Sequence, residues 1–395
     1  MKIRSIFIIL SLGSMGAWGH GFRQPDQDAA ATARGEAFVA TADNPSAIYY
    51  NPAGITQLEG LQTRVGLYNV SFESEFNDTF KTDGDMNVAP QIFAVYSPDE
   101  SPLSYGLGVY VPYGLSLEWP ETTGFRSAGL AADLAYTTVN PVIGWQICDT
   151  VSIGAGPTFN FGDLELKQGL SPFPGNDYFR FQGDGFAAGF NAGLMWQITE
   201  QFVFGAAYRS KTELDYEGSS RLFANIPPTD ITVTSAAELP TPQNIAAGLS
   251  WRPTPKWNIE FNVDWTDWNQ LNTVPIRQGI PVPPLTLNWE SSIYYELGGT
   301  YKFDNGWHVS AGYIYNENSM PDATYTPLVA DLDRQFLSVG AGSTIGNFSF
   351  DVAYQFGFAD SRNVTGSPVT LAGQTADGQY DFTSHAVALS VGWKF

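Results

Sequence analysis

The chain has 395 residues, a formal net charge of −21 at pH 7, an aromatic content of 14% and a single cysteine, Cys148. Nucleic-acid binding needs a basic surface, so a charge this negative excludes nucleic acid as a partner. One cysteine excludes a fold held together by internal disulfides.

The first nineteen residues have the pattern of a secretory signal peptide. Lys2 and Arg4 precede an apolar run over 6–12, and small residues at 17–19 offer a cleavage site. The apolar run is too short for a membrane helix, so we expect residues 1–19 to be a signal peptide that is removed on export. A buried N-terminal helix is the alternative.

The next segment, 20–60, has the pattern of neither a regular helix nor a central strand. Its stretch DNPSAIYYNPAG contains two Asn-Pro steps, and proline removes a backbone donor and displaces the preceding residue from helical geometry. A disordered tail is the alternative, but Phe38, Tyr49 and Tyr50 offer more apolar surface than a solvated tail carries. We therefore expect a compact, turn-rich segment.

Residues 61–395 alternate apolar and polar side chains, most clearly in 257–265, 348–358 and 387–395. Strict alternation indicates strands with one apolar and one polar face. Many of the expected strands suit a tilted membrane crossing, which needs about 9–11 residues. The fourteen expected strands are 61–76, 86–96, 103–117, 132–147, 151–165, 183–199, 202–217, 240–252, 257–268, 288–303, 308–318, 333–345, 348–358 and 382–395.

The connections alternate between short turns and long loops, the longest being 218–239, 269–287 and 359–380. This arrangement is typical of outer-membrane barrels and not of a soluble sandwich. Tryptophans gather near the strand ends, as expected for aromatic girdles at both membrane interfaces. Those near short turns or the C-terminus are Trp145, Trp196, Trp251, Trp257, Trp307 and Trp393, and those toward the long loops are Trp119, Trp265, Trp268 and Trp289.

The pattern thus predicts an all-β fold, a 14-stranded antiparallel transmembrane β-barrel formed by residues 61–395, in the outer membrane of a Gram-negative cell. An even strand count puts both chain ends on the short-turn side, which we expect to be periplasmic. The polar positions must then face the lumen, and we expect there Glu260, Asp264, Glu296, Asp351, Arg209 and Lys302.

Residues 35–60, GEAFVATADNPSAIYYNPAGITQLEG, resemble the N-terminal region of the FadL family, the long-chain fatty acid transporters of the Gram-negative outer membrane, which includes toluene and xylene uptake channels. The triplet Asn51, Pro52 and Ala53 matches the NPA motif of that family, and the resemblance continues in VYVPYGLSLEW and VNPVIGWQI. It implies that residues 20–60 fold into the lumen as a plug, or hatch. It also implies that the barrel-assembly machinery recognises the C-terminal Phe395, and we expect a monomer.

The third expected strand contains a proline. We expect its apolar alternation to face outward over Tyr105, Leu107, Val109, Val111 and Tyr113. Pro112 cannot donate to a ladder, Gly114 follows it, and the next strand carries Pro141; such residues are rare inside strands except at edges or bulges. Two neighbouring strands with missing donors indicate a kink, and the resemblance implies a lateral opening through which apolar ligand reaches the membrane. A bulge filled by side chains is the alternative.

Ligand contacts are harder to assign. Apolar clusters in the loops suggest Phe173, Phe179 and Phe223, besides Phe38 in the N-terminal segment, although mutual packing explains them equally well. A carboxylate head group would need a cation inside the barrel, and Arg64 or Arg209 would supply it.

We expect passive diffusion, because the sequence contains no nucleotide site to energise transport. The resemblance implies long-chain fatty acids as substrates, with outer-membrane lipid around the barrel. If no cation is essential, monoaromatic hydrocarbons of the toluene or xylene type become the better ligands. We expect no cofactor and no metal.

Two other functions remain as alternatives. A general porin would share the barrel, but it needs an open lumen that a plug would block. An outer-membrane hydrolase would need a nucleophile beside a base; His308 and Ser310 share an expected lumen face, but no acyl-transfer constellation surrounds them. We therefore expect the protein not to be an enzyme.

Overall fold

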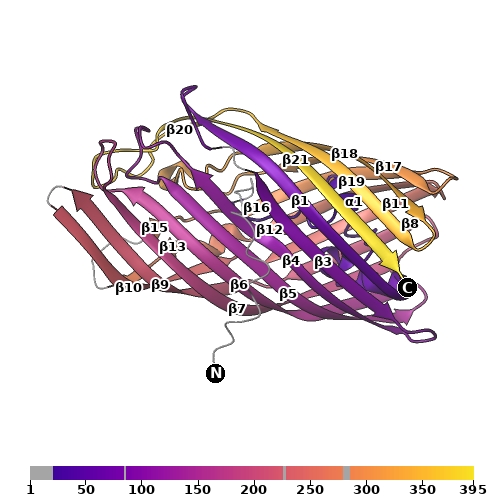
Figure 1. Ribbon diagram of the computed structural model, residues 1–395. Coiled ribbons are helices and arrows are strands. Elements are labelled where there is room, and N and C mark those ends of the chain that lie inside the picture. The colour runs from indigo at the N-terminus through magenta and orange to yellow at the C-terminus, as the bar shows by residue number, and fades with distance from the viewer. Residues whose placement is uncertain (1–20, 84–85, 226–227, 279–284) are drawn as a thin grey trace.

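The computed structural model describes residues 21–83, 86–225, 228–278 and 285–395, so the expected signal peptide lies outside the described residues. The chain forms a closed barrel of 14 antiparallel strands (Figure 1), which confirms the predicted fold class. The wall consists of β1 (Gly60–Phe76), β3 (Asn87–Ser97), β4 (Leu103–Glu118), β5 (Ala131–Cys148), β6 (Val151–Gly169), β7 (Tyr178–Gln197), β8 (Phe202–Arg209) continued by β9 (Thr212–Asn225), β10 (Pro228–Thr241) continued by β11 (Asn244–Thr254), β12 (Trp257–Thr266), β16 (Ser292–Lys302), β17 (Trp307–Asn316), β18 (Arg334–Ile345), β19 (Phe348–Ala359) and β21 (Gly378–Lys394).

The first and last wall strands close the barrel. β1 pairs with β21 from Gln62 opposite Lys394 to Phe76 opposite Tyr380. Hydrocarbon offers no hydrogen bonds to an open edge, so closure is what allows the sheet to cross a membrane. The turns expected from the sequence all lie at the end where the C-terminus lies, which we call the short-turn end; the opposite end is the long-loop end.

The expected loop 218–239 is wrong. β9 and β10 pair residue by residue from Thr212 opposite Thr241 to Asn225 opposite Pro228, so this region is a tall hairpin. Likewise β7 begins at Tyr178, five residues before the expected start at 183. These extra residues pair with β9. The outer face of this extension carries no apolar stripe, and a strand that rises beyond the bilayer needs none, which is why alternation did not reveal it.

The tryptophans divide between the membrane and the interior. All six near the short turns are exposed on the barrel, as the girdle prediction requires. At the long-loop end the prediction is wrong for three of four, because Trp119, Trp268 and Trp289 are buried inside. They belong to an apolar core that fills this end of the lumen together with inward-facing leucines.

The loops at the long-loop end carry short elements: β2 (Phe80–Lys81), η3 (Trp268–Gln270), β13 (Thr273–Val274), β14 (Ile276–Gln278), β15 (Leu285–Thr286), η4 (Asp322–Thr324) and β20 (Arg362–Val364). None of the helices in the part of the chain that the structure describes is long and apolar enough to cross a membrane.

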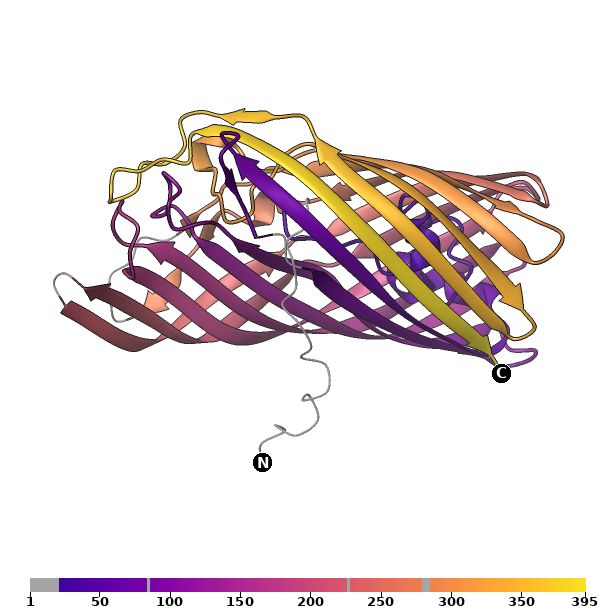
Figure 2. The same cartoon turned by 45° about the horizontal axis from the view of Figure 1, so that its top comes forward.

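Residues 21–59, here called the N-terminal segment, lie inside the barrel toward the short-turn end (Figure 2). The segment contains α1 (Ala29–Thr32), α2 (Ala47–Tyr50) and the 3₁₀ helix η2 (Pro52–Gln57). From 21 to 55 every residue is buried except Ala30, Asp43 and Asn44. Its apolar side chains pack against the inner wall, so the segment is no solvated tail.

Candidate functional site

The wall has an unpaired stretch between β3 and β4. These strands pair only from Ile92 opposite Val109 to Tyr96 opposite Tyr105, and the β4–β5 register shifts between Tyr110 and Tyr113. Pro112 lies in this bulge. The bulge inverts the alternation of β4, so the expectation that Val111 and Tyr113 face outward is wrong: both side chains are buried inside.

The N-terminal segment takes the place of the missing strand partner. The Gln24 amide donates to the Pro112 carbonyl at 2.8 Å, and the Gly114 amide donates to the Phe22 carbonyl at 2.9 Å. Gln27 contributes its side chain, which bonds both the amide and the carbonyl of Val111. Backbone groups that the bulge would leave unpaired are thus satisfied, as buried polar groups require.

Pro141 lies at a different interruption of the wall. The β5–β6 ladder breaks between Val139 and Ile143, but the Asn140 side-chain amide donates to the Pro157 carbonyl at 2.8 Å. Gly156 touches the opposite backbone so closely that a Cβ there would lie 1.9 Å from the Pro141 carbonyl oxygen. This interruption is therefore closed by direct contact between wall strands, whereas the one at Pro112 is covered by the N-terminal segment.

An apolar cavity of about 50 Å³ lies above the kink. Phe22 reaches it from the N-terminal segment, with its ring centroid 5.0 Å from that of Trp268 and 6.1 Å from that of Trp289. No polar surface lines it. Its other lining residues include Leu115, Leu134, Leu164, Leu239, Leu287 and Leu328.

A polar chamber of about 30 Å³ lies next to this cavity, immediately behind Pro112. Phe22, which lines the apolar cavity, contacts Tyr113, which lines the chamber, with 5.9 Å between the ring centroids. The chamber is lined by hydroxyl, amide and guanidinium groups, among them those of Arg23, Tyr49, Tyr110, Tyr136, Asn160, Arg209 and Asn244. The two spaces together have an apolar part and a polar part, as an amphiphile requires.

Arg209 differs from Arg23, the other arginine that lines the chamber. Its guanidinium lies 3.9 Å above the Tyr49 ring and donates to the Tyr49 carbonyl and, at 3.4 Å, to Asn244 Oδ1. Its polar contacts within the described ranges are all with neutral groups, and its Nε has no hydrogen-bond partner there. Arg23, by contrast, binds Asp264 at 2.6 Å.

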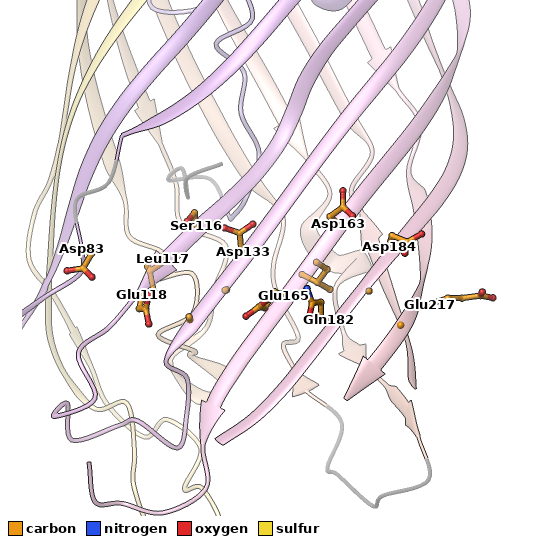
Figure 3. A pocket seen from close by; sticks show the side chains of 15 residues that line it. Asp83, Ser116, Leu117, Glu118, Asp133, Asp163, Glu165, Gln182, Asp184 and Glu217 are labelled. Carbon is orange, nitrogen blue, oxygen red and sulfur yellow. The ribbon is translucent and has the colours of Figure 1, made fainter. Parts of the chain in front are cut away.

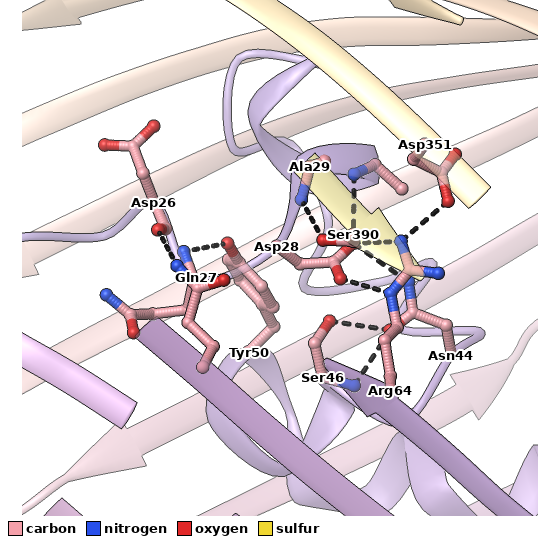
Figure 4. A network of polar contacts seen from close by, with 12 residues as sticks. Asp26, Gln27, Asp28, Ala29, Asn44, Ser46, Tyr50, Arg64, Asp351 and Ser390 are labelled. Carbon is pink, nitrogen blue, oxygen red and sulfur yellow. Dashed lines mark hydrogen bonds and ion pairs between the residues drawn. The ribbon is translucent and has the colours of Figure 1, made fainter. Parts of the chain in front are cut away.

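Arg64 is occupied by the N-terminal segment and so is no open ligand site. It pairs with Asp28 of that segment and with Asp351 of β19 at 2.7 Å (Figure 4). Because both carboxylates and the guanidinium are buried, removing one partner would leave an uncompensated charge. This triad ties the segment to the wall.

Asn51 explains the NPA triplet in physical terms. Its side-chain nitrogen donates to the Val39 carbonyl at 2.8 Å and to the Leu194 carbonyl of β7 at 3.0 Å, while its oxygen caps η2 at the Ala53 amide. Pro52 begins η2, where its missing donor costs nothing. A Cβ at Gly193 would lie 2.1 Å from the Asn51 oxygen, so the wall leaves room for this anchor.

The sequence model described as "Outer membrane protein transport protein (OMPP1/FadL/TodX)" matches residues 10–395. The chain belongs to this family. The FadL/TodX family consists of transport proteins, so the chain is an outer-membrane transporter of hydrophobic molecules, which confirms the resemblance, the predicted location and the general function.

The similar proteins include both fatty acid and toluene transporters by name. The chain is 23% identical to the long-chain fatty acid transport protein of Escherichia coli K12, over 99% of this chain and 97% of that protein. Among solved structures, a Pseudomonas aeruginosa FadL homologue has a TM-score of 0.86 at 20% identity, covering 95% of this chain and 100% of that one. The Ralstonia pickettii toluene transporter TbuX has a TM-score of 0.73 at 17% identity, covering 93% and 98%.

The structure separates the ligand-contact candidates of this FadL/TodX protein. Arg209 lines the polar chamber, and Phe179 belongs to the apolar core, although on β7 and not on a loop. Phe38 is buried against Tyr50 in the N-terminal segment. Phe173 is 74% exposed on a loop, and Phe223 lies on β9 stacked on Tyr178, at 5.7 Å between centroids.

Sequence reasoning missed Phe22, Gln27 and the inward leucines of the cavity. A signal existed for the leucines, because apolar residues occupy positions such as Leu134 and Leu164 where an aqueous lumen would carry polar ones. No local pattern marks Phe22 or Gln27, whose partners lie far away in sequence.

A concave surface of about 650 Å³ is on the outer face of the wall near the long-loop end (Figure 3). Its acidic residues alternate with the inward-facing Leu134, Leu164 and Tyr216, so they point away from the lumen. This lining repels anions. The carboxylates there are Asp83, Glu118, Asp133, Asp163, Glu165, Asp184 and Glu217.

The residues considered for hydrolysis do not act together. His308 Nε2 lies 2.7 Å from Asp351, whereas the Ser310 hydroxyl bonds that of Thr300 at 2.8 Å. Within 21–83, 86–225, 228–278 and 285–395, no group of three or more His, Cys, Asp or Glu residues could hold a metal ion.

Proposed function

We propose that this FadL/TodX protein carries long-chain fatty acids into the cell envelope by passive diffusion. The observation that supports this substrate is Arg209, an interior cation with no acidic partner in the described structure, beside an apolar cavity. An alkyl tail gains from leaving water for the leucine-lined cavity, and a carboxylate head gains a charge-assisted hydrogen bond from the guanidinium.

We further propose that the N-terminal segment is the plug and that the short-turn end faces the periplasm. The apolar cavity is far smaller than the roughly 300–1,000 Å³ of a typical ligand pocket. A bound alkyl chain must therefore displace something, and Phe22 is the side chain that the N-terminal segment places there. Displacing Phe22 pulls on its carbonyl bond to Gly114, which would uncover the unpaired edge of β4.

This geometry supports a lateral exit at Pro112. The stretch of β4 that lacks a strand partner lies beside both the cavity and the chamber, and the residues from Phe22 to Gln27 cover it around Pro112. An apolar molecule released there enters the membrane without crossing water. Pro141 has no such role in this proposal, because close backbone contact closes its interruption.

Monoaromatic hydrocarbons are the second candidate. The cavity exposes only apolar surface, which suits a neutral ring that has no head group. The two candidates differ in whether Arg209 matters, since a hydrocarbon offers the guanidinium no partner.

The deciding experiment measures binding of palmitate and of toluene to the purified protein by calorimetry. Arg209→Gln should weaken palmitate binding by about tenfold or more, because hydrogen bonds to charged groups contribute about 1.5–3 kcal/mol. Arg209→Lys should keep part of the affinity, and toluene binding should stay unchanged in both. Lys211→Gln, which removes an exposed cation two residues away, is the matched control. Unchanged palmitate binding by Arg209→Gln would rule out this head-group site.

A further inference from the structure

Two acidic side chains in the N-terminal segment are buried without a cation. Asp26 is 4% exposed and Glu36 is 2% exposed. Neither forms an ion pair with any residue that the structure describes. Three of the interior arginines are committed to other carboxylates: Arg23 to Asp264, Arg34 to Glu260, and Arg64 to both Asp28 and Asp351.

The backbone brings these two carboxyls together. Gly35 and Glu36 both have positive φ, 59° and 61°, so the chain reverses sharply after α1. A residue with a Cβ rarely adopts this conformation, and tertiary contacts must hold Glu36 in it. The Glu36 carboxyl lies beside that of Asp26, within hydrogen-bonding reach if one of the two holds a proton.

The hydrogen bonding of the pair is incomplete when both groups are ionised. Asp26 accepts from Gln355 at 3.1 Å and from Thr32 at 3.4 Å. Neither carboxyl oxygen of Glu36 has a hydrogen-bond partner among the described residues. A buried carboxylate without donors is strongly disfavoured, and a proton shared between the two carboxyls removes one charge and supplies one hydrogen bond.

The surroundings add negative charge, and the Tyr50 hydroxyl offsets only part of it. The groups that face the pair are Asp28 on its own segment, the Tyr49 and Tyr50 hydroxyls of α2, Glu296 of β16 and the Tyr68 hydroxyl of β1. Glu296 is engaged by Asn262, which donates to it at 2.9 Å. Asp264 of β12 and the Arg23 that it binds lie beyond Glu296 and cancel one another.

We propose that Asp26 and Glu36 share one proton that holds the N-terminal segment in the barrel, and that losing this proton to water as the pH rises loosens the segment. The carboxyl pair is thus a pH-sensitive contact that holds the N-terminal segment inside the barrel. This proposal rests on the position of the segment and does not depend on which substrate is carried.

The direction of the pH dependence follows from the two groups. Burial raises the pKa of Asp26 from 3.8 to about 6. Burial and the neighbouring Asp26 charge raise the pKa of Glu36 well above its usual 4.5. The shared proton therefore stabilises the folded segment fully below about pH 4, near the pKa of the free carboxyls. This stabilisation is lost as the pH rises through about 6 and beyond.

The test is amide hydrogen exchange of the full-length protein in detergent micelles between pH 5 and pH 8, normalised at each pH to the exchange of an unstructured chain. Protection of the amides in 26–42 should fall by up to about tenfold per pH unit from pH 5 upward, until the pH passes the raised pKa of the pair, since one proton is released on opening. Protection of wall amides, for example in β12, should not follow this trend.

Asp26→Asn combined with Glu36→Gln should abolish the slope, because neither side chain then ionises. If the double variant fails to fold into a heat-modifiable barrel, Glu36→Gln alone should flatten the slope. Glu59→Gln, an exposed acid of the same segment, is the matched control and should behave as the parent. A flat profile in the parent protein, or a slope that survives in the variant, would overturn the proposal.

Discussion

Gln27 holds both polar groups of the Val111 backbone. Its side-chain nitrogen donates to the Val111 carbonyl at 2.8 Å, and its side-chain oxygen accepts from the Val111 amide at 3.1 Å. Gln27 thereby imitates a strand neighbour at a position where β4 has no ladder to β3. The same residue links the kink to α2, because its own amide donates to the Tyr50 hydroxyl at 2.9 Å.

Gln27→Ala should therefore loosen the kink. It leaves the Val111 amide and carbonyl buried without partners, at about 1–3 kcal/mol each. We expect faster hydrogen exchange at Val111 and Gly114 and a higher ion conductance in planar bilayers. Gln146→Ala, at an exposed wall position, is the control. Unchanged hydrogen exchange at Val111 would show that the Gln27 side chain does not stabilise the kink.

Phe22→Ala should tighten fatty acid binding. The ring fills space that an alkyl chain needs, so removing it spares the ligand the displacement, although the loss of packing costs about 3–5 kcal/mol locally. We expect a several-fold lower Kd for palmitate by calorimetry. Phe38→Ala removes an equally buried ring away from the cavity and should leave the Kd unchanged. Weaker binding by Phe22→Ala would mean that the ring belongs to the binding site.

Gly298→Ala should push the N-terminal segment away from the wall. A Cβ there would lie 1.8 Å from the Arg34 carbonyl oxygen, and backbone has to move to admit it, at about 1–3 kcal/mol. We expect faster hydrogen exchange over residues 33–36. Gly299→Ala offers a matched control on the next residue, where no atom comes closer than 3.3 Å. Equal effects of the two variants would contradict the contact.

Pro112→Val should tighten the wall, because valine restores a backbone donor within the bulge. We expect severalfold slower fatty acid uptake in cells at a normal amount of folded barrel. Pro98→Val, in a short turn at the opposite end of the wall, should leave uptake unchanged. Normal uptake by Pro112→Val would count against a lateral exit at this kink.

The barrel could be predicted because contact with lipid favours an apolar side chain at almost every second residue of a strand. The alternation in 257–265 and the girdle tryptophans such as Trp145 and Trp251 are local signals, and each strand carries its own. The prediction failed for the upper parts of β9 and β10. These strands continue beyond the bilayer, where no lipid contact favours apolar residues. It failed again in β4, because one bulge inverted the faces of Val111 and Tyr113.

The sequence by itself determined the strands, their short turns and a turn-rich leading segment, since period-two alternation and proline geometry act over a few residues. Only the tertiary structure decided which arginine is committed and which is available. Arg64 and Asp351 lie hundreds of positions apart, as do Arg23 and Asp264, so no local pattern could show that these charges are paired while Arg209 has no acidic partner in the described chain. Pairing in a lumen is set by which strands the closed barrel places opposite the segment, and that is a property of the whole fold.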